Sequence, residues 1–132
     1  MPMLYREAPL NGIWEGSGNV ICLDILRALA RDPEARAALE GALDAARGAD
    51  RRYDAALAAF RGRWPDLPDP AEARAYAEAA AHLLTAATLF SAAPVPVAES
   101  YVAGRLAARG LTPGAVSGLA VPDLIGRLGA RD

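Results

Sequence analysis

The stretch Asp69–Ala92 decides the fold, and it reads DPAEARAYAEAAAHLLTAATLFSA. Asp69 followed by Pro70 and Glu72 is a typical helix start. Asp caps free backbone amides, Pro fits the first turn, and an acidic group faces the positive end of the helix dipole. The residues that follow are mostly alanine and leucine, with no glycine or proline before Pro94. The pattern predicts one long helix over residues 69–92, with small side chains facing its neighbours.

Glycine and proline divide the rest of the chain into further helical segments, and no alternation typical of strands appears. Asn19 is expected to cap a first helix over residues 20–30, and the apolar circumference of this helix predicts a place inside a bundle. The sequence also predicts helices over 33–48 and 50–64, a fifth helix after Pro96 with Gly110 as its cap, and short terminal helices from Thr112 and Val121. The expected fold is all-α, an antiparallel up-and-down helical bundle of about five main helices plus short terminal helices.

The length of 132 residues predicts a single helical domain over 1–132. Residues 1–18 are expected to form a loop that leads into the first helix, and residues 65–70 an internal linker. The most apolar window, Ala79–Ala98, contains His82 and two prolines, so we expect a buried helix there and no membrane span. The first residues have no basic stretch followed by an apolar one, and a cytoplasmic protein is therefore expected.

The scarcity of reactive side chains excludes several kinds of site. Cys22 is the single cysteine and His82 the single histidine, so the sequence excludes an internal disulfide, a Cys-based metal site and a multi-histidine metal site. No metal site is expected. We expect His82 to be structural and paired with Glu78, four residues earlier on the same helix. Cys22 is expected to be inert core on the most buried helix.

The residues before the first helix form an unusual loop. Asn11–Asn19 reads NGIWEGSGN, and its three glycines are costly to order. Such a loop indicates that its backbone must approach something closely. The remaining composition, rich in alanine, is consistent with a plain helical interaction module.

The run Leu4–Arg27 reads LYREAPLNGIWEGSGNVICLDILR. It resembles the acyl-CoA dehydrogenase superfamily, and within it most closely the bacterial branch of adaptive alkylation-response flavoproteins. Dehydrogenases of this superfamily carry an aromatic-Glu-Gly-Thr/Ser loop just before a C-terminal helix, and Trp14–Ser17 matches that loop. Gly12 stands where this branch has Ser, which puts a hydroxyl contact in doubt.

The resemblance implies that this chain is the distal part of the C-terminal helical domain of a longer enzyme. The partners it implies are the missing N-terminal and middle dehydrogenase domains, and a homo-oligomer. Met1-Pro2-Met3 then looks like an artificial or misassigned start. The cofactor FAD is expected in the full-length context and not on this chain alone, which is expected to be inactive.

The resemblance also implies a chemistry for individual residues. Glu15 would be the catalytic base that removes the α-proton of an acyl-CoA thioester while the β-hydride passes to FAD. Trp14, Gly16, Ser17 and Asn19 would be the cofactor-binding residues, with Gly16 allowing close approach of the backbone and the polar side chains donating hydrogen bonds.

The alternative is a non-enzymatic helical module that acts by oligomerisation or by contacting DNA. Arg27 is the candidate nucleic-acid contact, because Arg31, Arg51 and Arg52 could form a basic patch with it. Aspartates lie among these arginines, and the formal net charge is −2, which favours ordinary ion pairing.

Overall fold

The computed structural model describes residues 18–107 and 118–129, and within them every element is helical. The elements are α2 (Gly18–Arg31), α3 (Pro33–Asp44), α4 (Arg51–Arg63), the short 3-10 helix η1 (Pro70–Glu72), α5 (Ala73–Ala92), α6 (Val95–Arg105) and α7 (Val121–Gly129). The predicted all-α fold is confirmed. None of these helices combines the length and the apolar character needed to cross a membrane.

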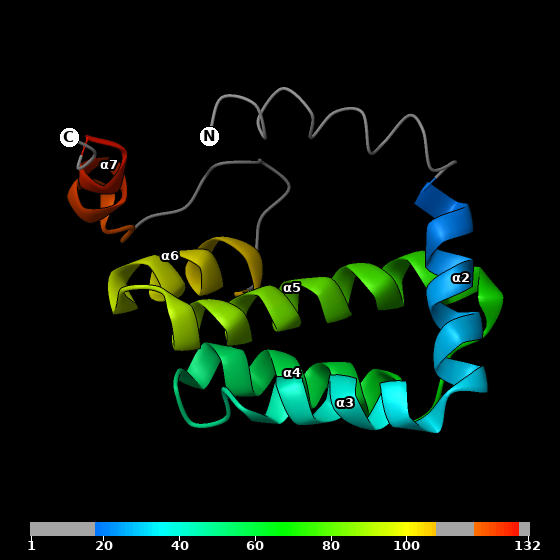
Figure 1. The fold of residues 1–132 in the computed structure, drawn as a ribbon. Coiled ribbons are helices and arrows are strands. Elements are labelled where there is room, and N and C mark those ends of the chain that lie inside the picture. Colours follow the sequence, from blue (N-terminus) through cyan, green and yellow to red (C-terminus); the bar gives the residue numbers. More distant parts are fainter. Residues whose placement is uncertain (1–17, 108–117, 130–132) are drawn as a thin grey trace.

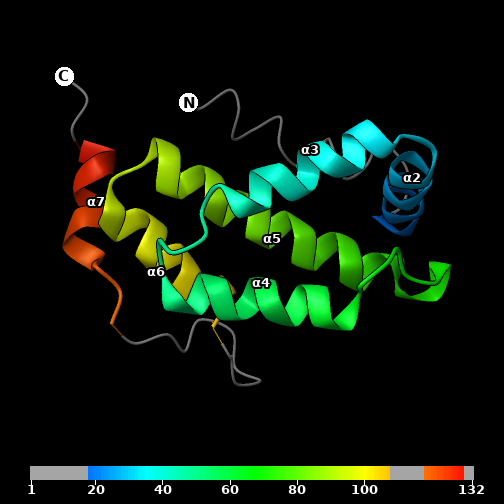
Figure 2. The same ribbon diagram turned by 90° about the horizontal axis from the view of Figure 1, so that it is seen from below.

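Helices α3 to α6 run up and down beside one another, while α2 stands across one end of them (Figure 1). Helix α5 lies at the centre when the bundle is seen from below (Figure 2). It contacts α2, α3, α4 and α6, so it forms the axis around which the other helices pack.

Aspartates cap three of the helices, as their position before the helical segments predicts. Asp32 Oδ1 accepts hydrogen bonds from the amides of Glu34 and Ala35, at 3.0 and 3.1 Å. Asp69 Oδ1 accepts one from the amide of Ala71 at 2.8 Å. Each bond satisfies an amide that has no partner within its own helix.

Asp50 caps α4 and also forms an ion pair with the residue two positions on. Its Oδ1 accepts a hydrogen bond from the Arg52 amide at 2.7 Å, and its Oδ2 lies 2.5 Å from Arg52 Nη2. The hydrogen bonds from Arg52 hold the pKa of the Asp50 carboxyl below its usual value of 3.8. Folding lowers the pKa of Asp50, so the ion pair stabilises the fold at a pH above the pKa that Asp50 has in the unfolded chain. This stabilisation is lost as the pH falls through the pKa that Asp50 has in the folded protein.

We therefore expect the Asp50→Asn protein to lose less stability than the wild type when the pH falls below about 4. Asn keeps the oxygen that caps the helix but carries no charge that acid can remove. Asp50→Ala should in addition cost about 1 kcal/mol at neutral pH through the lost cap. Circular dichroism melts from neutral to acidic pH measure both effects. Asp69→Asn is the control, since Asp69 caps η1 without an ion pair to a described residue. An Asp50→Asn protein whose Tm falls with pH as steeply as that of the wild type would contradict the prediction.

The predicted boundaries of α2, α3 and α5 differ from the structure. Helix α2 begins at Gly18, so Asn19 lies inside the helix and is not its cap. The predicted helix over 33–48 ends at Asp44, because the chain turns through Gly48, whose φ of 84° favours glycine. The long helix expected from residue 69 starts with the 3-10 turn η1, and its α-helical part begins at Ala73.

Helix α6 differs from the prediction at both ends. It starts at Val95, so Pro96 lies in its first turn, where the missing amide proton is not needed. It ends at Arg105, so Gly110 does not cap it: the amides of Leu106 and Ala107 both donate to the carbonyl of Val102. The short helix expected from Thr112 lies outside the described residues.

The core consists of large side chains from α2 to α6 and of alanines on α5. The largest fully buried side chains are Leu43, Tyr53, Leu83 and Val102. The hydroxyl of Tyr53 donates a 2.6 Å hydrogen bond to the carbonyl of Leu43, so this buried polar group is satisfied. The large apolar residues that recur at helical spacing along α4 and at its C-terminal end are all buried: Tyr53, Leu57, Phe60 and Trp64.

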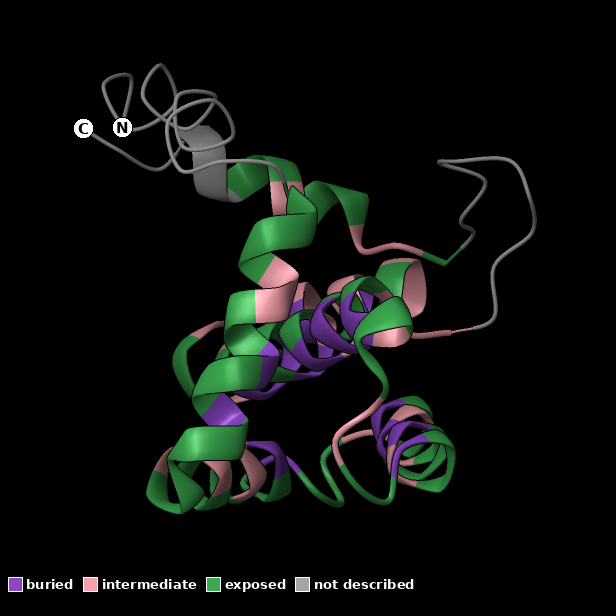
Figure 3. Ribbon diagram, turned by 90° about the vertical axis from the view of Figure 1, so that its right-hand side faces the viewer, coloured by how far each residue is buried: buried purple, intermediate pink, exposed green. Residues whose placement is uncertain are grey.

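Helix α2 is far more exposed than its apolar composition predicts (Figure 3). Leu26 and Leu29 are buried, whereas Val20, Ile21 and Ile25 expose 47, 40 and 38% of their surface. The helix crosses the end of the bundle, so other described elements cover one side of it. The expectation of a place inside the bundle is therefore wrong. Cys22 is likewise half-buried and does not lie on the most buried helix.

Candidate functional site

The structure describes one end of the site predicted from the sequence. The motif Trp14–Ser17, which includes the predicted base Glu15, lies outside the described residues. Asn19 is described, and it lies in the first turn of α2. The visible part of the candidate site is therefore the point at which the motif joins the helical bundle.

Asn19 ties the start of α2 to the start of α5. Its Oδ1 accepts a hydrogen bond of 3.0 Å from Nη1 of Arg74, a residue 55 positions further along the chain. Its Nδ2 donates to no other described residue. A hydrogen bond between Asn19 and a flavin stays a prediction.

The arginines of the predicted basic patch are paired in part. Arg27 Nη1 lies 2.7 Å from Asp24 Oδ1, and both side chains are about 60% exposed. Arg52 is paired with Asp50 in the same way. The Asp24–Arg27 pair follows from the i, i+3 spacing on α2, and the Asp50–Arg52 pair from the position of Asp50 as the N-cap of α4. DNA contact by Arg27 stays a prediction, and the pairing leaves less positive charge for phosphate groups.

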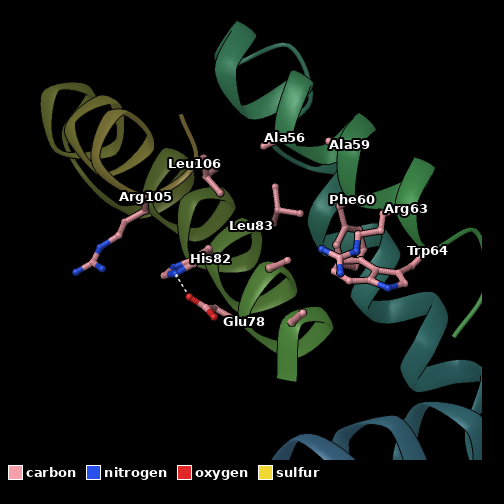
Figure 4. Close-up of a pocket in the computed structure, with 12 residues that line it drawn as sticks. Ala56, Ala59, Phe60, Arg63, Trp64, Glu78, His82, Leu83, Arg105 and Leu106 are labelled. Atoms are coloured by element: carbon pink, nitrogen blue, oxygen red, sulfur yellow. Dashed lines mark ion pairs between the residues drawn. The ribbon is translucent and has the colours of Figure 1, made fainter. Parts of the chain in front are cut away.

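A groove between α4, α5 and α6 is a second candidate site, and the sequence did not predict it (Figure 4). Its volume is about 380 Å³, which is within the range of small-ligand sites. The lining is mostly apolar, with Phe60, Leu83, Leu106 and several alanines. The polar side chains on the groove come from Arg63, Glu78, His82 and Arg105.

His82 joins two helices at one end of the groove. Its Nδ1 lies 2.8 Å from the hydroxyl of Tyr101 on α6, in a hydrogen bond whose direction depends on the tautomer. Its Nε2 lies 3.7 Å from Glu78 Oε1, which confirms the predicted pair. Both ring nitrogens thus face groups of the protein itself, as expected for a structural histidine.

The other end of the groove is lined by Arg63 and Trp64, which also contact Glu72 (Figure 4). The guanidinium carbon of Arg63 lies 4.4 Å from the centre of the Trp64 ring. Glu72 accepts hydrogen bonds from Arg63 Nη2 at 2.6 Å and from Trp64 Nε1 at 3.1 Å. These bonds hold the pKa of the Glu72 carboxyl below its usual value. The charge of Arg63 is already balanced, so we assign no reaction to this groove.

Sequence reasoning missed the groove because its walls come from three separate helices. Tyr101 lies on α6, and its hydroxyl contacts His82, which lies 19 positions earlier on α5. His82 and Tyr101 are polar residues on two consecutive helices, and a buried polar group needs a hydrogen-bond partner. This need is the signal from which the sequence could have paired the two residues. No group of three or more His, Cys, Asp or Glu residues that could hold a metal ion occurs in the described ranges.

The comparison with known proteins gives a partial match. Over 72 residues this chain is 44% identical to an Escherichia coli (strain K12) protein named "Putative acyl-CoA dehydrogenase AidB". The match covers 54% of this chain and 13% of that relative, so the chain spans a small part of the relative's length. No family model and no solved structure matches the chain. The predicted resemblance is thereby confirmed as a segment related to an acyl-CoA dehydrogenase.

Proposed function

We propose, from this relation, that the chain supplies the C-terminal helical part of a FAD-dependent oxidoreductase of the acyl-CoA dehydrogenase type. The observation that carries the proposal is the 44% identity over 72 residues to AidB. The sequence Trp14-Glu15-Gly16-Ser17 adds the motif in which dehydrogenases of this kind carry their base.

In this proposal Glu15 is the catalytic base. Its carboxylate accepts the α-proton of an acyl-CoA thioester and becomes a neutral carboxylic acid. FAD, when bound, supplies the acceptor for the β-hydride. Trp14 borders the flavin or the acyl group, Gly16 lets the backbone pass close to it, and Ser17 and Asn19 hydrogen-bond to it.

The same proposal assigns partners to the chain. Because the match covers 13% of AidB, the flavin-carrying N-terminal and middle domains are to be supplied by another part of a longer protein. A homo-oligomer of that protein is proposed as well. The 132-residue chain by itself is then inactive, since it brings the base but not the flavin site.

The test is to express the reading frame extended upstream of Met1 and to look for bound flavin. We expect a yellow protein whose flavin absorbance bleaches when an acyl-CoA is added without oxygen, whereas the 132-residue chain binds no flavin. The chain without its upstream part is the control. An absent upstream frame, or an extended protein without flavin, would overturn the proposal.

A further inference from the structure

A second pocket lies between α3, α4 and α5, and we refer to it as the Tyr76 pocket. Its volume is about 370 Å³, which is within the range of small-ligand sites. The aromatic side chains that line it are Phe60, Trp64 and Tyr76. The charged side chains that line it are Arg36, Glu40, Arg61 and Asp66. None of these charged residues lines the groove of Figure 4, so the pocket is a separate site.

Tyr76 brings a hydroxyl without a partner to this pocket. The residue is 4% exposed, and its ring centre lies 5.1 Å from that of Phe60 and 5.5 Å from that of Trp64. Its hydroxyl forms no hydrogen bond to a described residue, in contrast to the hydroxyl of Tyr53, which donates to the Leu43 carbonyl. No fully enclosed side-chain N or O atom of the described residues lacks a partner, so the Tyr76 oxygen is accessible from the pocket. Burial raises the pKa of the Tyr76 phenol above its usual value of 10.0, which keeps the hydroxyl protonated and able to donate.

The charged groups of the pocket balance one another. Arg61 donates to Oε2 of Glu40 through Nε, at 3.1 Å, and through Nη2, at 2.5 Å. Nη2 of Arg36 lies 3.4 Å from Oδ1 of Asp66, whose side chain is 89% exposed. Two arginines and two carboxylates give the lining no net charge. A charged ligand of either sign would therefore meet a group of its own sign in the pocket.

The lining keeps hydrogen-bonding groups that the protein itself does not use. Oε1 of Glu40 accepts no hydrogen bond from a described residue, because Arg61 binds the other oxygen. Arg36 donates to the described part of the chain through the long bond to Asp66, which leaves further N–H groups for a ligand. Together with the Tyr76 hydroxyl, the pocket offers both donors and an acceptor beside its aromatic rings.

We propose that the Tyr76 pocket binds a small uncharged aromatic compound whose polar group both donates and accepts hydrogen bonds, such as a carboxamide. The carbonyl oxygen of the ligand accepts from the Tyr76 hydroxyl and from Arg36, its amide nitrogen donates to Glu40, and its ring contacts the aromatic walls. The pocket uses no residue of the motif Trp14–Ser17, so this inference goes beyond the proposed function and does not depend on it.

The first measurement is the thermal stability of the 132-residue chain without a ligand. We expect Tyr76→Phe to keep the Tm of the wild type or to raise it, because the lost hydroxyl has no protein partner to leave behind. Tyr53→Phe is the matched control, since it breaks the bond to the Leu43 carbonyl and should lower the Tm by about 2–8 °C. If Tyr76→Phe lowers the Tm as far as Tyr53→Phe, the Tyr76 hydroxyl already has a partner in the chain and the inference is overturned.

The second measurement is the binding of benzamide, followed by the fluorescence of Trp64. Trp14→Phe serves as the background, because it leaves Trp64 as the single tryptophan. We expect saturable binding in the millimolar range, weakened about three- to tenfold by Tyr76→Phe. Arg36→Gln should weaken binding as well. Arg47→Gln is its control and should leave binding unchanged, since Arg47 pairs with Asp44 and does not line the pocket.

Benzoate and benzamidine test the absence of net charge, because they carry the same ring with a negative and a positive group. We expect each of them to bind more weakly than benzamide. Benzoate that binds more tightly than benzamide would show an anion site and would overturn the inference. Benzamide that does not bind, or that binds equally well to Tyr76→Phe, would show that the hydroxyl serves no such ligand and would overturn it too.

Discussion

Phe60→Ala should destabilise the chain by about 3–5 kcal/mol, which corresponds to a fall in Tm of about 10–20 °C. Phe60 is 5% exposed and lies between two other aromatic rings of the core. Its ring centre is 5.4 Å from that of Trp64 and 5.1 Å from that of Tyr76. The substitution removes the apolar burial of the ring and leaves a cavity that the rigid neighbouring rings cannot fill.

The measurement is urea unfolding followed by circular dichroism. Phe60→Leu is the matched control, because leucine keeps most of the apolar volume and loses mainly the aromatic contacts. These are worth about 0.5–1.5 kcal/mol per pair. A Phe60→Ala protein within 1 kcal/mol of the wild type would show that this cluster does not form the core between α4 and α5.

Glu15→Gln should lower the rate of flavin reduction by about 10²–10⁴-fold in the extended protein, if Glu15 has the proposed role. Glutamine has nearly the same shape as glutamate, but its neutral amide cannot accept the α-proton of the thioester. Flavin content should stay that of the wild type, because the substitution leaves the proposed contacts of Ser17 and Asn19 in place. Stopped-flow absorbance under anaerobic conditions measures the rate.

Glu34→Gln provides the control for this experiment. Glu34 is an exposed carboxylate in the first turn of α3, with no proposed role in catalysis. Its replacement should leave the rate of flavin reduction unchanged. A Glu15→Gln protein that keeps its flavin and reacts within threefold of the wild type would show that the base lies elsewhere.

The helix starts could be predicted because their causes are local. The aspartates at positions 32, 50 and 69 bind amides two or three residues ahead, so a short window of sequence contains the whole interaction. The stripe from Tyr53 to Trp64 was equally readable, since one helix face carries all of its members. Helix ends were harder to predict: the end of α6 depends on competition among successive amides for the carbonyl of Val102.

The burial of α2 could not be predicted from its composition. An apolar circumference shows that a helix has surface to bury, but it does not show whether another described helix covers that surface. Val20 and Ile25 remain exposed because α2 crosses the end of the bundle. The crossing is a tertiary arrangement that periodicity does not encode.

The location of the candidate site was predicted mainly from the resemblance of its motif to a known family. The physical properties of the residues contributed little to this prediction. Glycines around a Trp-Glu pair indicate a loop that approaches a partner, but the kind of partner came from the resemblance. Asn19 shows the limit of local reasoning. It was predicted as a helix cap, but it lies inside α2 and its side-chain oxygen accepts a hydrogen bond from Arg74, 55 residues away, while its contact with a flavin stays a prediction.

The bond between Asn19 and Arg74 also has a consequence for the order of folding. Helices that follow one another in sequence, such as α4 and α5 or α5 and α6, contact each other directly, so those pairs close short loops. The contacts between α2 and α5 close a much longer loop and carry a larger entropic cost. Because α2 also packs on its sequence neighbour α3, we expect the α2–α3 contacts to form before the α2–α5 contacts when the chain folds.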